Sequence, residues 1–161
     1  MSISYPRSSV RLVLAAVFAL AFLTPAGFAS AQYVPSRVSI TFDDGWQSQY
    51  VNAVPVLQEN NLKATFYIYT GAVLGEFVGY MSSSTVRSLS ATHEIGTHSR
   101  SHSDLTAGSS TASMANFLNY EIQGSKNDLL GMGVGTVTTF AYPYGAYGSN
   151  GTVRPEILQA L

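Results

Sequence analysis

The chain has 161 residues, a formal net charge of −1 and no cysteine. Its length and an apolar fraction of 46% are typical of one globular domain, and the even charge balance argues against a nucleic-acid partner, which requires a basic surface. Without cysteine there is no disulfide, no thiol nucleophile and no cysteine zinc site, so stability must come from a packed core or a metal ion.

The N-terminal segment has the composition of a secretory signal peptide. Two arginines precede the apolar run of residues 12–23, and Ala29-Ser30-Ala31 forms a small-residue cleavage motif. The run is shorter than the about 20 apolar residues that a membrane-spanning helix needs. We therefore expect residues 1–31 to be removed, leaving a mature chain without a stable membrane span that is secreted or held in the periplasm or cell envelope. An uncleaved N-terminal anchor is the alternative.

Short strands alternate with helical segments along the rest of the chain. Runs of β-branched and aromatic residues indicate the strands, and apolar residues three or four apart indicate the helices. Strands are expected at residues 37–42, 63–69, 94–98 and 137–142, and helices at 50–60, 84–91, 111–130 and from 153 to the end, with a glycine-rich loop after residue 69. This alternation predicts βαβ units and a parallel sheet, and hence an α/β fold.

The number of βα units is small for a closed barrel. A (β/α)8 barrel takes about 250 residues, and residues 32–161 supply about half of that. We therefore expect the domain in residues 32–161 to be truncated at its C-terminus.

Polar residues follow three of the expected strands, at the ends where parallel α/β folds place their functional groups. Asp43 and Asp44 follow the first strand, His98 and His102 lie in T-H-S-R-S-H after the third, and Y-P-Y-G (142–145) follows the fourth.

The two histidines are a candidate metal-binding pair. His98 and His102 are four residues apart, and we expect them on one face of a helical turn, close enough to bind one ion. Two imidazoles and one carboxylate leave coordination positions open for water, as catalytic metal sites do. Taken alone, an H-x-x-x-H pair is also compatible with loop or capping histidines.

The adjacent aspartates can take different roles at such a site. If one of them binds a cation, its charge is compensated, and its neighbour stays ionised nearby and can accept a proton from water. Gly45 behind them allows a sharp backbone turn. The alternative is that Asp43 and Asp44 cap the helix that follows.

These residues resemble the three leading motifs of the polysaccharide deacetylases of carbohydrate esterase family four, the NodB homology domain. The motifs are T-F-D-D-G (41–45), T-H-S-R-S-H (97–102) and F-A-Y-P-Y-G (140–145). The resemblance runs from about Arg37 to the end of the chain. It implies an α/β fold, a distorted (β/α) barrel that is incomplete at the C-terminus here.

The resemblance also implies a metal site. The second aspartate of the first motif is a ligand in the family, which is Asp44 here, and the second motif supplies His98 and His102. Ser99 is expected to order the loop between them. The expected metal is Zn²⁺, with Co²⁺ or Mn²⁺ as alternatives.

The same motifs imply the catalytic groups. Asp43 corresponds to the catalytic base, and the backbone N–H of Tyr144 is expected to face the developing oxyanion, so that Tyr144 also binds substrate. Trp46 and Tyr50 are candidates for an aromatic platform under a sugar ring, and packing is the alternative for both.

Four other residues are expected to be structural. Tyr67 and Tyr69 lie on an expected strand and are assigned to the core or barrel wall. His93 is assigned to the edge of a strand, because a lone histidine is usually structural. Arg100 is interpreted as a solvated loop charge, although contact with an anionic polymer is an alternative.

Two departures from the family pattern bear on function. Ala141 stands where the third motif usually has an arginine that braces the catalytic aspartate. The later family motifs, which supply a pocket wall and a histidine general acid, are not found in this chain.

We therefore predict a metal-dependent hydrolase that removes acetyl groups from N- or O-acetylated polysaccharide, such as peptidoglycan, chitin or poly-N-acetylglucosamine. The expected protein is a monomer whose partner is that polysaccharide, with no nucleic acid. The alternative is a non-catalytic remnant that binds metal or glycan without turnover.

Overall fold

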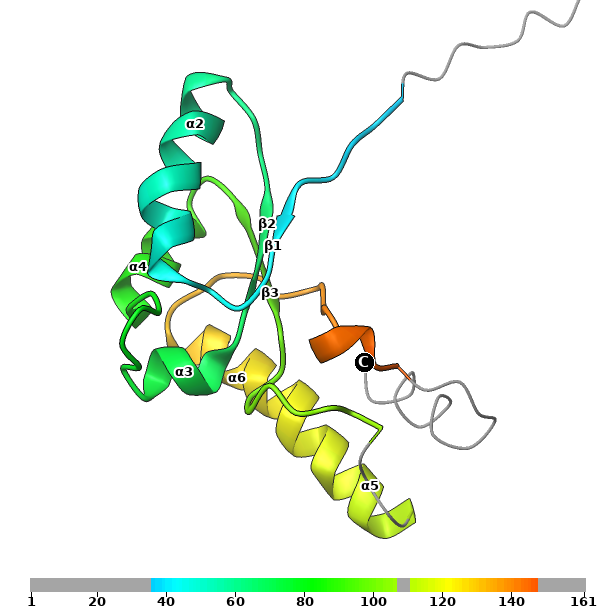
Figure 1. The fold of residues 1–161 in the computed structure, drawn as a ribbon. Coiled ribbons are helices and arrows are strands. Elements are labelled where there is room, and N and C mark those ends of the chain that lie inside the picture. The colour runs from blue at the N-terminus through cyan, green and yellow to red at the C-terminus, as the bar shows by residue number, and fades with distance from the viewer. Residues whose placement is uncertain (1–35, 107–110, 148–161) are drawn as a thin grey trace, which may run out of the picture. The chain divides into compact units, whose positions relative to one another are not determined.

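The structure, a computed structural model, describes residues 36–106 and 111–147 (Figure 1). The chain divides at Arg37 into two units, and the described sheet and helices belong to the second, Val38–Leu161. The expected signal peptide and the expected helix from residue 153 lie outside the described residues. Within the described ranges, no helix has the length and apolar character needed to cross a bilayer.

A parallel sheet forms the centre of the second unit (Figure 1). Its strands are β1 (Thr41–Phe42), β2 (Thr65–Ile68) and β3 (Glu94–Thr97), in the order β1-β2-β3. Phe42 lies beside Phe66, and Phe66 lies beside Ile95. The parallel sheet predicted from the alternation of strands and helices is confirmed.

All four expected strands are shorter than predicted, and two of them are much shorter. Only the last two residues of the segment 37–42 form β1, although the carbonyl of Ile40 still accepts a hydrogen bond from the Thr65 N–H at 3.0 Å. The segment 137–142 makes a single parallel bridge, from Phe140 to Thr97. These segments lie at the two edges of the described sheet, where each has one neighbouring strand to hold it.

Helices follow each of the three strands. The three helical regions expected at 50–60, 84–91 and 111–130 are confirmed, the first and last with a π-helical turn in them. The helices are η1 (Gln49–Ala53), α2 (Val54–Glu59), α3 (Thr70–Leu74), α4 (Ser83–Leu89), α5 (Thr111–Leu118), η2 (Asn119–Gln123), α6 (Gly124–Gly131) and the short η3 (Pro143–Gly145). Both α4 and α6 pack on β3.

Helix α3 was not predicted, because Gly71 and the glycines that follow the helix made the segment after β2 look like a loop. It forms because its first turn is held from outside the helix. The Thr70 hydroxyl donates to Asp128 at 2.9 Å, and the Gly71 N–H donates to the carbonyl of Arg100 at 2.9 Å. A helix of five residues needs such tertiary support, since isolated short helices are marginal in water.

The core lies between the sheet and its helices. Phe66 and Ile68 of β2 are fully buried, and the Phe66 ring stacks on Phe42 with centroids 4.8 Å apart. Leu57 of α2 and Val86 of α4 belong to the same buried cluster. Because side chains alternate along a strand, Thr65 and Tyr67 turn to the opposite face of the sheet.

His93 is buried just before β3, as a structural residue. It is 7% exposed, its Nδ1 accepts a hydrogen bond from the Ala64 N–H at 3.3 Å, and its ring meets the edge of Phe66. Burial lowers the pKa of His93, and the positive charge of Lys63 lowers it further.

This buried histidine predicts a loss of stability in acid. Because the folded-state pKa of His93 lies below the ordinary value of about 6.5, the unfolded chain binds a proton more readily than the folded one. The His93 contribution to the free energy of unfolding is therefore complete above about pH 6.5 and falls as the pH drops toward the folded pKa. Urea denaturation of the metal-free wild type and His93→Gln between pH 8 and pH 5 tests this. The wild type should lose more stability in acid than the variant, and parallel pH profiles would contradict the assignment.

Candidate metal centre

Three side chains meet at the carboxyl ends of the parallel strands. Asp44 follows β1, and His98 and His102 follow β3. The Asp44 Oδ1 atom lies 3.0 Å from His102 Nε2 and 3.5 Å from His98 Nε2. One ligand atom from each residue falls within 4.8 Å of the other two, so the predicted trio comes together.

The backbone between the two histidines differs from the helical turn that was predicted. They do not share a helical turn, because Ser99 and His102 adopt left-handed conformations with φ of 67° and 57°. The buried Ser99 hydroxyl accepts the His102 N–H at 3.0 Å and closes the loop, as expected for Ser99. The imidazole centroids are consequently 4.9 Å apart.

The main chain fixes the orientation of His98. Its Nδ1 atom lies 2.9 Å from the carbonyl oxygen of Ala141. A carbonyl oxygen only accepts hydrogen bonds, so Nδ1 carries a proton, and in the neutral ring Nε2 presents a lone pair to Asp44. His98 is 3% exposed, which leaves its ring little freedom to turn.

His102 is held by aromatic neighbours. Its Nδ1 atom lies 3.1 Å from the Tyr144 hydroxyl, and the rings of Tyr144 and Tyr69 pack on it with centroids 4.8 Å and 5.5 Å away. Burial raises the pKa of Tyr69, and the negative charge of Glu121 adds to this effect. Tyr69 therefore stays a neutral phenol beside the site.

Trp46 contacts the third member of the trio. Its indole Nε1–H donates to Asp44 Oδ2 at 3.0 Å, while its ring stacks on Tyr80 at 4.1 Å. Asp44 itself has a left-handed backbone with φ of 75°. One carboxylate oxygen is thus occupied by the indole, and the other faces the two histidines.

This donor set fits a divalent cation. With Nδ1–H of His98 paired to a carbonyl, a lone pair on Nε2 and a carboxylate oxygen face each other without a proton between them. Two such electron-pair donors repel unless a cation or an added proton lies between them. Two imidazole nitrogens and one carboxylate oxygen are also ligands that Zn²⁺ accepts.

Asp43, the other member of the doublet, is not one of the three clustered residues. Its side chain is exposed, and its backbone carbonyl accepts the Gln49 amide at 2.6 Å. The helix that follows, η1, has Ser48 at its N-cap position and no side-chain cap hydrogen bond. The alternative that the doublet caps this helix is therefore wrong.

Tyr144 and Tyr50 differ in their relation to the site. Tyr144 has a left-handed backbone with φ of 59° and is 74% exposed beside His102. Tyr50 is partly buried and packs against the main core cluster, so packing explains it.

Sequence reasoning missed Tyr69 and Tyr80 as neighbours of the site, although the position of Tyr69 directly after β2 was a usable signal.

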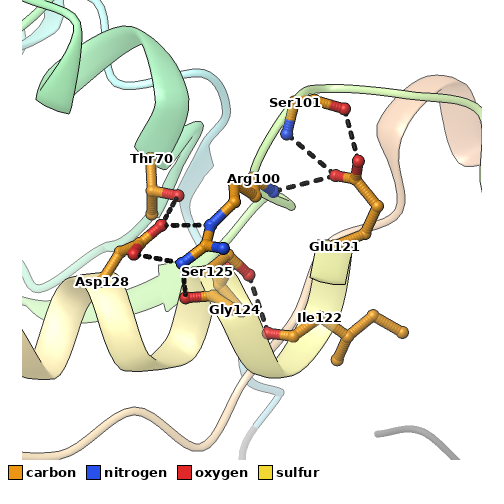
Figure 2. Close-up of polar contacts among 9 residues, drawn as sticks. Thr70, Arg100, Ser101, Glu121, Ile122, Gly124, Ser125 and Asp128 are labelled. Carbon is orange, nitrogen blue, oxygen red and sulfur yellow. Dashed lines mark hydrogen bonds and ion pairs between the residues drawn. The ribbon is translucent and has the colours of Figure 1, made fainter. Parts of the chain in front are cut away.

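Arg100 is not the solvated charge that was predicted. Figure 2 shows its guanidinium on the Asp128 carboxylate, with contacts of 2.8 Å and 2.5 Å, and on the Gly124 carbonyl at 3.1 Å. It also lies 4.8 Å over the Tyr120 ring. The hydrogen bond to Asp128 raises the pKa of Arg100. The prediction failed because the partners lie twenty or more residues away along the chain.

The fold and the site define a class: a parallel α/β domain with a candidate metal centre at the carboxyl ends of its strands. The family description "Polysaccharide deacetylase" matches residues 31–157. The chain belongs to the polysaccharide deacetylase family, as the motifs predicted.

Three relatives illustrate the likeness. A chitin deacetylase of Pestalotiopsis sp. is 38% identical over 72 residues, which are 45% of this chain and 24% of that protein. The Streptococcus pyogenes deacetylase PplD in complex with acetate superimposes with a TM-score of 0.67 at 24% identity, covering 81% of this chain and 56% of that one. A family 4 carbohydrate esterase from Streptomyces lividans, also with acetate, gives a TM-score of 0.60 at 25% identity, covering 80% and 60%.

These likenesses confirm the predicted fold class, the distorted (β/α) barrel of the deacetylases. The chain spans less than two thirds of each of these three relatives. It thus corresponds to part of the barrel.

The Arg100 pair predicts a measurable loss of stability. Arg100→Met keeps a long apolar side chain but leaves the nearly buried Asp128 carboxylate without its main partner. We expect the free energy of unfolding to fall by about 1.5–3 kcal/mol, the range for hydrogen bonds to charged groups. Arg87→Met, on the exposed face of α4, is the matched control and should change it by less than about 0.5 kcal/mol. Equal urea midpoints for the two variants would show that the Arg100 pair contributes nothing.

Proposed function

We propose that this protein is a metal-dependent hydrolase that removes acetyl groups from N- or O-acetylated polysaccharide. The observation that carries the proposal is the meeting of Asp44 Oδ1 with the Nε2 atoms of His98 and His102 at the carboxyl edge of the sheet. Membership of the deacetylase family supports the reaction class.

The residues that would hold the ion are Asp44, His98 and His102. We propose Zn²⁺, since two imidazoles and a carboxylate suit it, with Co²⁺ or Mn²⁺ as substitutes. When bound, such an ion supplies Lewis acidity to a carbonyl oxygen and increases the acidity of a bound water.

Asp43 is proposed as the general base. It is adjacent to a proposed ligand but stands outside the cluster, and its exposed carboxylate is free to accept a proton from the attacking water. The backbone N–H of Tyr144 is proposed to donate to the oxygen that becomes negatively charged as the carbonyl is attacked.

Trp46 and Tyr144 are proposed to contact the sugar. Trp46 is 39% exposed although its indole N–H and its stacked face are already in use, so it retains surface for a pyranose ring. The similarity to a chitin deacetylase favours an N-acetylglucosamine polymer, and peptidoglycan has the same acetamide group. Such substrates lie outside the cytoplasm, which agrees with the proposed signal peptide in residues 1–31.

Metal content provides the first test. The wild type should bind about one divalent ion per chain, and His98→Ala and His102→Ala should lose it, because each removes an imidazole ligand. His93→Gln is the matched control: it alters the third histidine of the chain, which lies in the core, and should retain the ion. Elemental analysis of the four dialysed proteins decides the point. Equal metal content in all four would refute the proposed site.

The two adjacent aspartates should behave differently. Asp44→Asn should lose metal, because a neutral amide is a poor ligand, whereas Asp43→Asn should keep metal and lose about 10²–10⁴-fold in rate, as expected for a general base. Acetate release from N-acetylglucosamine oligomers measures the rate, and Glu59→Gln, an exposed carboxylate on α2, should match the wild type. Unchanged acetate release by Asp43→Asn would exclude it as the base.

A further inference from the structure

We propose that Glu121 is a positioning residue for the metal centre: its buried carboxylate fixes the segment between the two histidines and thereby sets their separation. This inference rests on the proposed metal site. Glu121 contacts neither Asp44 nor the histidines in the trio described above, so its effect would pass through the backbone of the segment 99–102.

The hydrogen bonds of the Glu121 carboxylate are with this segment. Glu121 lies on η2 and is 1% exposed. Its Oε2 atom accepts the N–H groups of Arg100 at 3.1 Å and of Ser101 at 2.8 Å, and its Oε1 accepts the Ser101 hydroxyl (Figure 2). A carboxylate buried to this degree is stabilised by these three donors.

Because two of its partners are backbone N–H groups, the Glu121 carboxylate favours one backbone conformation of the segment 99–102. A lysine or arginine partner could follow the carboxylate by changing rotamers, whereas the N–H groups of residues 100 and 101 point where the main chain directs them. Hydrogen bonds to a charged acceptor are also about twice as strong as neutral ones. Glu121 therefore selects one conformation of the segment.

The segment needs such support because its backbone is strained. Ser99 and His102 both have positive φ, and left-handed conformations are unfavourable for residues other than glycine. They persist only where surrounding contacts determine the backbone.

Other contacts also hold this segment. Helix α3 donates hydrogen bonds to its backbone carbonyls, and Asp128 binds the Arg100 side chain. The Thr70 N–H donates to the Ser99 carbonyl at 3.3 Å, and the Gly71 N–H donates to the Arg100 carbonyl at 2.9 Å. At Gly71 a Cβ atom would lie 2.2 Å from that carbonyl, so only glycine permits the approach. The contacts from α3 are to backbone carbonyls of the segment. Glu121 instead accepts hydrogen bonds from its backbone N–H groups, and it does so with a buried carboxylate.

A pair of variants separates positioning from general stability. Glu121→Met has similar length but no acceptor, and leaves the N–H groups of Arg100 and Ser101 without this partner. Glu121→Gln keeps an oxygen for both N–H groups and an amide that can donate to the Ser101 hydroxyl. The proposal predicts that Gln rescues what Met loses.

The test measures zinc affinity of folded, metal-free full chains by competition with a chromophoric chelator, together with amide hydrogen exchange at residues 100 and 101. Glu121→Met should raise the Kd for zinc about 10–100-fold, as outer-shell changes typically do, and should speed exchange at both amides. Glu121→Gln should stay near the wild type in both measurements. A contribution to stability alone would lower the melting temperature of Glu121→Met and leave the Kd of its folded fraction unchanged.

The outcomes distinguish this inference from the proposed function. If the wild type binds zinc and Glu121→Met binds it equally tightly, the inference is wrong and the metal site stands. If the wild type binds no zinc, the proposed metal site fails and the inference fails with it.

Should Glu121→Met not fold, Ser101→Ala, at an exposed position, removes one of the three donors. It should weaken zinc binding in the same direction, and unchanged binding would overturn the inference.

Discussion

The site is organised by the repulsion among three electron-pair donors. A carboxylate oxygen of Asp44 and the Nε2 atoms of His98 and His102 are directed at one point, and the Asp44 oxygen and the His98 Nε2 lone pair repel each other unless a positive charge lies between them. The protein therefore has to hold the donors together against their mutual repulsion. Much of the structure around the sheet edge serves this purpose.

Backbone conformations and hydrogen bonds around the cluster hold the three donor atoms in place. Of the six described residues other than glycine with positive φ, four lie at or beside the cluster: Asp44, Ser99, His102 and Tyr144. Each donor is also oriented by a second contact, which comes from the Ala141 carbonyl, the Tyr144 hydroxyl or the Trp46 indole. Rigid support of this kind lets ligands stay in place before an ion binds, which reduces the free energy needed to order them.

Sequence reasoning singled out the aspartate doublet and the two histidines because each follows a strand and parallel strands end at one edge, and the family resemblance then selected Asp44 as the ligand. It failed where a residue depends on a partner far along the chain. Arg100 was misread since nothing local points to Asp128, and α3 was missed since its first turn depends on Thr70 reaching that same aspartate. The i, i+4 spacing of the histidines correctly implied proximity and wrongly implied a helix, because their loop conformation depends on the Ser99 hydroxyl and on tertiary contacts.

The contact between Trp46 and Asp44 has an optical consequence. Trp46 is the one tryptophan of the 161-residue sequence, and its indole N–H is bonded directly to a carboxylate of the cluster. Indole emission depends on the local electric field and on quenching neighbours, here the stacked ring of Tyr80. The tryptophan fluorescence of this chain therefore originates at the site itself, so the unlabelled chain has a built-in spectroscopic reporter of the charge on Asp44.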